Sequence, residues 1–156
     1  MIDCGEGAQL QFRKSHLKFS RLNHIFISHL HGDHCFGLLG LISTLNLLGR
    51  TAELHIHSPK GLETLLTPML DFFNRQMTYK VLFHEFDTKE PMLIYEDRSL
   101  TVTTIPLRHR MPCCGFLFAE KRRPNHIIRE MVDFYQVPVY ELNRIKNGAD
   151  YVTPEG

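Results

Sequence analysis

The stretch SHLHGDHCFG, residues 28–37, places three histidines and one aspartate within six positions. It directly follows the apolar run at 25–27, which predicts the end of a buried strand. A solvated loop has no need of imidazoles at such close spacing, whereas a metal site does. His29 and His31 are two residues apart, so their side chains can point the same way in an extended loop. Residues 28–37 therefore predict a metal site where a strand gives way to a helix.

Four candidate ligands in six residues exceed what one tetrahedral zinc ion takes comfortably from so short a segment. We therefore predict two neighbouring metals, with His29 and His31 on one and with Asp33 and His34 on the other. The first pair needs a third ligand from elsewhere, and His109 is the best candidate because it follows a predicted strand. The alternative for His109 is a surface histidine between two arginines.

Length and composition bound the class of protein. The 156 residues are enough for one domain with a real core, and 43% hydrophobic and 22% charged residues are ordinary for a soluble globular chain. The net charge of +1 gives no global basic signal, so any nucleic-acid surface has to be local. No apolar run approaches the roughly 20 residues that span a bilayer, so no membrane partner is expected.

The cysteines predict a reducing compartment. Cys4, Cys35, Cys113 and Cys114 show no CxxC spacing, and we interpret them as reduced, buried thiols of a cytoplasmic protein. Cys35 lies beside His34, so a soft metal ligand is the alternative there.

Strand-like and helix-like segments alternate along the chain and predict sheets covered by helices. The expected strands span 22–28, 53–57, 80–86, 92–95, 100–105 and 115–119, and the expected helices span 34–48, 60–74 and 124–135. The remaining histidines are predicted to be structural or exposed: His16, His24, His84 and His126 as isolated residues, and His55 and His57 as an HxH pair with one strand face each.

Several stretches carry a family resemblance. SHLHGDH matches the signature of the metallo-β-lactamase superfamily of two-metal hydrolases. Three further segments resemble the ribonuclease Z family. Its opening strand and glycine turn resemble IDCGEGAQLQ (2–11), and its third motif resembles PLRHRMPCCGFLF (106–118). The segment that closes its arm resembles ELNRIKNG (141–148). That family trims the 3′ end of precursor tRNA. The resemblance covers essentially the whole chain and implies an α/β class, namely an α+β four-layer αββα sandwich.

The resemblance also assigns roles at the site. It implies that His29, His31 and His109 bind one zinc ion and that Asp33 and His34 bind a second, with Asp33 also accepting a proton. Two metals can activate water and neutralise charge at phosphorus, so the implied chemistry is physically sound. Asp3 is expected to accept a hydrogen bond from a ligating imidazole, with an Asx turn before Gly5 as the alternative.

The implied substrate is precursor tRNA, and a basic segment favours RNA contact. Six Lys or Arg residues lie between 108 and 129 against one acidic residue. Lys121, Arg122 and Arg123 are expected to grip phosphates from an arm at about 120–148, with an ordinary solvated loop as the alternative. The arm lacks the Gly-Pro-rich turn typical of bacterial members. The family also forms homodimers, and this implies the same here.

Two other functions stay open at this point. One is a different hydrolase of the superfamily, acting on a lactone, a thioester or a small phosphodiester, and the other is a non-catalytic metal-binding or RNA-binding fragment. We also expect that residues 1–156 form about half of the fold and are inactive as a nuclease alone. The sequence supplies five candidate ligands. Two zinc ions additionally require a shared carboxylate and a further histidine, and no motif after His109 provides them.

Overall fold

The computed structural model describes residues 1–73 and 76–153. The chain divides into two compact units, Met1–Ala119 and a second one that begins at Glu120. The expected helix over 60–74 ends with Asn74, which lies outside the described residues. No helix in the described part of the chain is long and apolar enough to cross a membrane.

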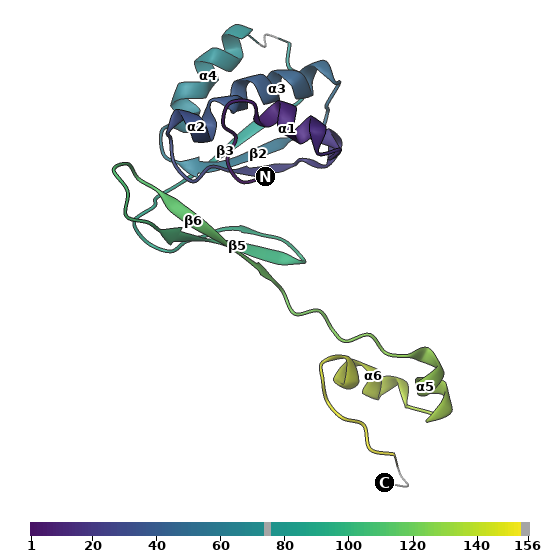
Figure 1. The fold of residues 1–156 in the computed structure, drawn as a ribbon. Coiled ribbons are helices and arrows are strands. Elements are labelled where there is room, and N and C mark those ends of the chain that lie inside the picture. The colour runs from purple at the N-terminus through teal and green to yellow at the C-terminus, as the bar shows by residue number, and fades with distance from the viewer. Residues whose placement is uncertain (74–75, 154–156) are drawn as a thin grey trace. The chain divides into compact units, whose positions relative to one another are not determined.

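The first unit is built on a parallel sheet in the order β1-β2-β3, of which Figure 1 labels β2 and β3. Its strands are β1 (His24–Phe26), β2 (Leu54–Pro59) and β3 (Val81–Phe86). Ile2 adds a parallel bridge to Phe26, so the N-terminal residues lie beside β1. Parallel strands bring their carboxyl ends to one edge of the sheet, where α/β proteins place their sites.

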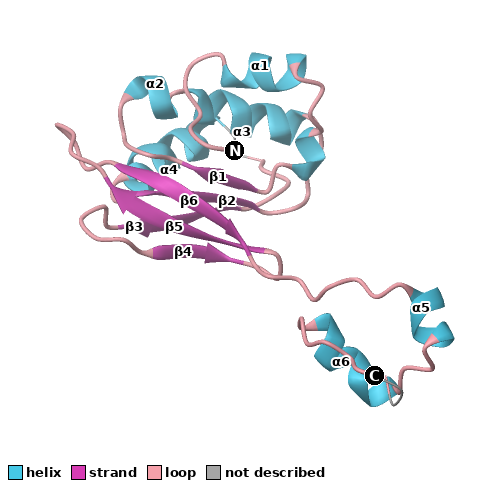
Figure 2. Cartoon of the chain, turned by 60° about the horizontal axis from the view of Figure 1, so that its bottom comes forward, coloured by secondary structure: helices cyan, strands magenta, loops and turns pink. Residues whose placement is uncertain are grey.

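Helices cover one face of this sheet (Figure 2). They are α1 (Ala8–Lys14), α2 (Gly32–Cys35), α3 (Gly37–Leu47) and α4 (Leu62–Phe73), with a 3-10 turn, η1 (Phe19–Arg21). Alternate strand residues point to this face, so Ile25, Leu54 and Ile56 pack against leucines of α3 and form the main core.

A second sheet covers the other face. It has the order β4-β5-β6, with β4 (Leu93–Glu96), β5 (Leu100–Pro106) and β6 (Cys114–Glu120). Aromatic rings join the sheets: Phe26 lies 5.3 Å from Phe118 and Phe86 lies 6.3 Å from Phe116 between ring centroids. The unit therefore contains a helix layer and two sheet layers, which are three of the four layers expected.

The outer face of the second sheet is apolar and open. Leu93, Ile105 and Leu117 are each about half exposed. Leu93 pairs with Thr103, two positions from Ile105, so these side chains share one face of the sheet. This is the face that the fourth layer of an αββα sandwich would cover.

Four histidines line the inner face between the sheets, and we call His24, His55, His57 and His84 the histidine quartet. The rings stack across three strands, and His24 Nδ1 lies 3.2 Å from His57 Nε2 while His55 Nδ1 lies 2.9 Å from His84 Nε2. The expectation that His55 and His57 occupy different faces is wrong, because residues two apart on a strand share a face.

The expected helix over 34–48 is divided in two. The Gly37 N–H donates to the Cys4 carbonyl at 2.8 Å instead of continuing the helical ladder to the Asp33 carbonyl. Contact with the N-terminal turn therefore separates α2 from α3, which no local propensity indicates.

The second unit contains α5 (Arg129–Phe134) and α6 (Val139–Lys146). The expected helix over 124–135 begins only at Arg129, because the Asn125 N–H pairs with the Lys146 carbonyl at 2.7 Å and Ile128 is extended. Helices α1 and α6 were not predicted at all. Residues 2–11 contribute a single bridge and then a helix rather than an opening strand.

Candidate metal centre

The residues of the candidate site lie in segments that follow the strands at the carboxyl edge of the parallel sheet. After β1, the Ile27 N–H still bonds to the His57 carbonyl at 2.8 Å, and the chain then departs through Ser28 into the loop before α2. Asp3 follows the Ile2 bridge at the same edge. The topology therefore brings Asp3 and the SHLHGDH loop together although 25 residues separate Asp3 from Ser28.

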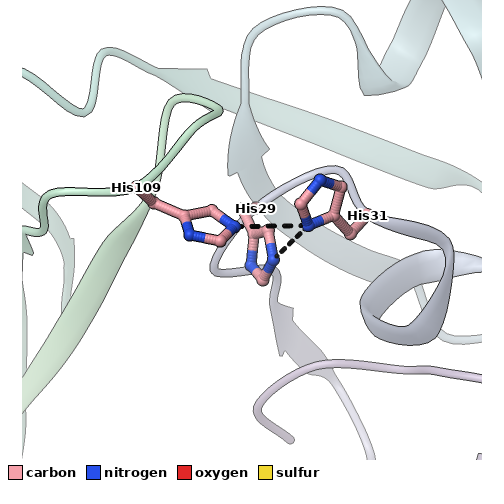
Figure 3. A group of neighbouring side chains, drawn as sticks. All are labelled: His29, His31 and His109. Atoms are coloured by element: carbon pink, nitrogen blue, oxygen red, sulfur yellow. Dashed lines mark hydrogen bonds between the residues drawn. The ribbon is translucent and has the colours of Figure 1, made fainter.

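Three imidazoles converge in this loop region (Figure 3). His29 Nε2 lies 3.0 Å from His31 Nδ1, and His109 Nε2 lies 3.3 Å from the same His31 atom. His109 comes from the loop between β5 and β6, so the triad joins two sheets. Within the part of the chain that the structure describes, this is the only group of three His, Cys, Asp or Glu side chains close enough to share an ion.

The triad fits a zinc ion on its own geometry. Zinc–nitrogen bonds of 2.0–2.1 Å in a tetrahedron place two ligand nitrogens about 3.3 Å apart. The nitrogen–nitrogen distances from His31 Nδ1 to His29 Nε2 and to His109 Nε2, 3.0 and 3.3 Å, agree with that spacing. Burial first and then the neighbouring imidazoles lower the pKa of His29, which favours the neutral ring that a metal requires.

Asp33 and His34 form a second pair beside the triad. His34 Nε2 lies 3.4 Å from Asp33 Oδ2, and the His34 and His29 ring centroids are 4.0 Å apart. Asp33 stands at the start of α2 with 79% of its side chain exposed. The pair therefore offers one nitrogen and one carboxylate next to the first group, as two adjacent metals would need.

Asp3 bonds across to the loop rather than within its own turn. Its Oδ1 accepts the Ser28 N–H at 2.8 Å, and its Oδ2 lies 2.8 Å from His34 Nδ1. These bonds favour the expected orienting role over an Asx turn. Asp3 has a φ of 52°, a left-handed conformation that is uncommon for a non-glycine residue and is often found at functional sites.

Two glycines allow the N-terminal turn to lie directly on α2. A Cβ atom at Gly5 would overlap the Asp33 carbonyl, and one at Gly37 would overlap the Gly5 carbonyl. The Cys4 N–H donates to the His34 carbonyl at 2.8 Å across the same contact. This close approach of two backbones brings the Asp3 carboxylate to His34.

The remaining candidates are not part of the triad. Cys35 is buried and its thiol donates to the His31 carbonyl at 3.3 Å, and burial raises the pKa of that thiol. His16 and His126 are exposed, and Glu6 is exposed in a turn. All four cysteines are free and buried.

The basic residues of the expected arm belong to the second unit. Arg122 and Arg123 are exposed, and with Lys121 and Lys146 they line an open hollow of about 690 Å³. Glu120 is the one acidic residue lining it. The hollow therefore has an excess of positive charge.

Comparison with known proteins decides the family. Residues 1–127 match the family model described as "Beta-lactamase superfamily domain". The chain belongs to the beta-lactamase superfamily. The fold is accordingly that of the metallo-β-lactamases, and the histidine loop occupies the strand-to-helix junction that the superfamily signature led us to expect.

Relatives within the superfamily carry a more specific name. The chain is 83% identical over all 156 residues to a ribonuclease Z of Bacteroides fragilis and 81% identical to that of Bacteroides thetaiotaomicron. The chain covers 51% and 49% of these relatives, so it spans about half of their length. The crystal structure of human tRNase Z, short form, superposes on the chain with a TM-score of 0.70 at 26% sequence identity. The superposition covers 99% of this chain and 73% of the human chain.

Sequence reasoning missed one polar residue of this site, Ser28. Its hydroxyl lies within 3.5 Å of Asp3, His29 and His34. The serine stands first in the SHLHGDH signature, but nothing in its spacing distinguishes it from an ordinary strand-end serine.

Proposed function

We propose that this protein is a zinc-dependent endoribonuclease that removes the 3′ trailer from precursor tRNA. The observation that carries the proposal is the convergence of His29, His31 and His109 beside the Asp33–His34 pair. The 83% identity to a ribonuclease Z over the whole chain supports the choice among superfamily hydrolases.

In this proposal the first zinc is held by the histidine triad and the second by Asp33 and His34. When bound, such a pair of metals activates water near neutral pH and neutralises charge at a phosphoryl oxygen. Asp33, whose carboxylate is exposed next to the triad, would accept the proton that the attacking water loses. The water oxygen would bond to phosphorus as the bond from phosphorus to the 3′-oxygen breaks. The trailer would leave with a 5′-phosphate, and the 3′-oxygen would take a proton from solvent to give a 3′-hydroxyl on the tRNA body.

The substrate class is tested by grafting. These 156 residues replace the aligned part of the Bacteroides fragilis ribonuclease Z, and the chimera is assayed on a 3′-extended precursor tRNA, on bis-p-nitrophenyl phosphate and on a thioester. We expect one cut at the tRNA 3′ boundary with a rate far above those for the small esters. Faster turnover of the thioester or small diester would favour another superfamily hydrolase, and salt-sensitive tRNA binding without turnover would favour a non-catalytic role.

The basic arm predicts a salt-dependent effect. The double variant Arg122→Ala, Arg123→Ala is expected to raise KM for precursor tRNA and leave the single-turnover rate at saturation unchanged. Each lost phosphate contact should reduce the slope of log K against log salt by roughly 0.7–0.9. The matched control is Arg13→Ala with Lys14→Ala, an exposed basic pair on α1. Normal tRNA binding by the arm variant at every salt concentration would contradict the role of the arm.

We further propose that the protein works in the cytoplasm as a homodimer. Four free, buried cysteines support a reducing compartment. The dimer follows from the family resemblance and is checked by light scattering of the chimera.

A further inference from the structure

The Ser28 hydroxyl stands between the two candidate ligand groups. Its Oγ lies 3.0 Å from Asp3 Oδ2, 3.0 Å from His29 Nδ1 and 3.5 Å from His34 Nδ1. His29 belongs to the triad and His34 to the second pair, so one half-buried hydroxyl touches both groups.

The chemistry of the partners fixes the direction of these hydrogen bonds. A carboxylate only accepts, and a serine hydroxyl has one proton to donate. The Ser28 O–H therefore donates to Asp3 Oδ2 and accepts from His29 Nδ1–H. The proton on Nδ1 leaves the lone pair of His29 on Nε2, the atom that lies 3.0 Å from His31 Nδ1 in the triad.

The same carboxylate oxygen sets the second group. Asp3 Oδ2 accepts a hydrogen bond from His34 Nδ1–H at 2.8 Å, which leaves the lone pair of His34 on Nε2, beside Asp33 Oδ2. One aspartate oxygen thus acts on His34 directly and on His29 through a hydroxyl. Partners of this kind fix the tautomer and ring orientation of ligating imidazoles.

We propose that Ser28 is a positioning residue that links the Asp3 carboxylate to the His29 ring by two hydrogen bonds, and we call this chain the relay. Through it, one carboxylate orients a ligand of each metal group. The positioning role rests on the proposed metal-dependent function. The tautomer assigned to His29, with its proton on Nδ1, does not depend on bound metal. Loss of an outer partner of a metal ligand typically lowers metal affinity about 10-fold to 100-fold.

The backbone of Ser28 is held independently of its hydroxyl. Its N–H donates to Asp3 Oδ1 at 2.8 Å, and its carbonyl accepts the Cys114 N–H at 3.1 Å. Ser28→Ala therefore removes the relay and leaves both anchors, and Ser28→Thr keeps a hydroxyl. Ser43 is a matched control, because its hydroxyl bonds only to the Leu39 carbonyl within α3 in the part of the chain described.

Long-range proton–nitrogen NMR of the ¹⁵N-histidine-labelled chain without metal tests the relay. We expect His29 to carry its proton on Nδ1 in the wild type, in Ser28→Thr and in Ser43→Ala, and to lose that preference in Ser28→Ala. His34 should change only when Asp3 is replaced, so Asp3→Asn should alter both rings and Ser28→Ala only one. An unchanged His29 tautomer in Ser28→Ala would overturn the relay, as would a wild-type His29 protonated on Nε2.

Zinc titration against a chelating indicator completes the test. Ser28→Ala should bind zinc about 10-fold to 100-fold more weakly than the wild type, and Ser28→Thr should recover most of the loss. Equal zinc affinity in the wild type and Ser28→Ala would overturn the positioning role. A wild type that binds no zinc would instead contradict the proposed function, and the tautomer measurement would still decide the relay.

Discussion

Replacing Asp33 with alanine is expected to reduce the single-turnover rate of precursor-tRNA cleavage by the chimera about 10²-fold to 10⁴-fold or more. This is the range for the loss of a positioned acid or base, and Asp33 is also proposed to bind a metal. With 79% of its side chain exposed, it contributes little to the packed core, so the fold should survive. The loss should therefore appear in the chemical step.

The matched control for Asp33→Ala is Asp71→Ala, which removes an exposed aspartate from α4. Both variants should bind precursor tRNA with wild-type affinity, measured by filter binding at a fixed salt concentration. A cleavage rate for Asp33→Ala within twofold of the control would remove Asp33 from the proposed chemistry.

Mild acid is expected to destabilise the first unit through the histidine quartet. Burial first, and then the neighbouring histidines, lower the pKa of His57 to about 3 and that of His24 to about 4, from 6.5. The folded state therefore binds fewer protons than the unfolded state between these values. The contribution of these two histidines to the free energy of unfolding is therefore fully present above pH 6.5, and it is lost as the pH falls towards 4 and then 3.

The size of this effect follows from the shifts. His57 is 3% exposed, and at roughly 1.4 kcal/mol per pH unit a histidine with such a shift should cost about 2 kcal/mol of unfolding free energy between pH 6.5 and pH 5. Two further charged groups act on His24. The Met1 amino group repels the charged ring and lowers the pKa of His24, whereas Asp97 raises that pKa. Tyr95 packs on His24 at 4.4 Å between ring centroids.

Urea unfolding at pH 7.5 and pH 5 measures this loss. His57→Phe keeps an aromatic ring beside Phe26, so it should reduce the difference in unfolding free energy between the two pH values. His126→Gln, at an exposed position, should leave that difference unchanged. A wild type that is equally stable at both pH values would contradict the prediction.

Much of the fold could be predicted because the strands have strong local patterns. The expected strand over 100–105 is β5 at 100–106, and the one over 115–119 is β6 at 114–120. The helix boundaries failed where a distant segment competed for backbone hydrogen bonds. Cys4 interrupts the helix at Gly37, and Lys146 holds Asn125 out of α5.

The metal centre could be predicted only in part for the same reason. The SHLHGDH spacing predicts ligands because four of the candidates lie within six consecutive residues. The placement of His109 beside His31 depends on a loop 78 residues away, and local sequence left it open. Ser28 could not be recognised because its role depends on Asp3, which the pairing of Ile2 with Phe26 brings beside it. The histidine quartet was also hidden, because it needs three strands in register.

Zinc binding by the triad is the central claim, and metal analysis of the purified chain tests it most directly. Elemental analysis after dialysis should find the same zinc content in the wild type and in His126→Ala, and the zinc of the triad should be lost from His31→Ala. Apparent energies of structural zinc sites are about 10–16 kcal/mol, so removing one of three donors should cost several kcal/mol of affinity. Undiminished zinc in His31→Ala, at the wild-type affinity, would contradict the account.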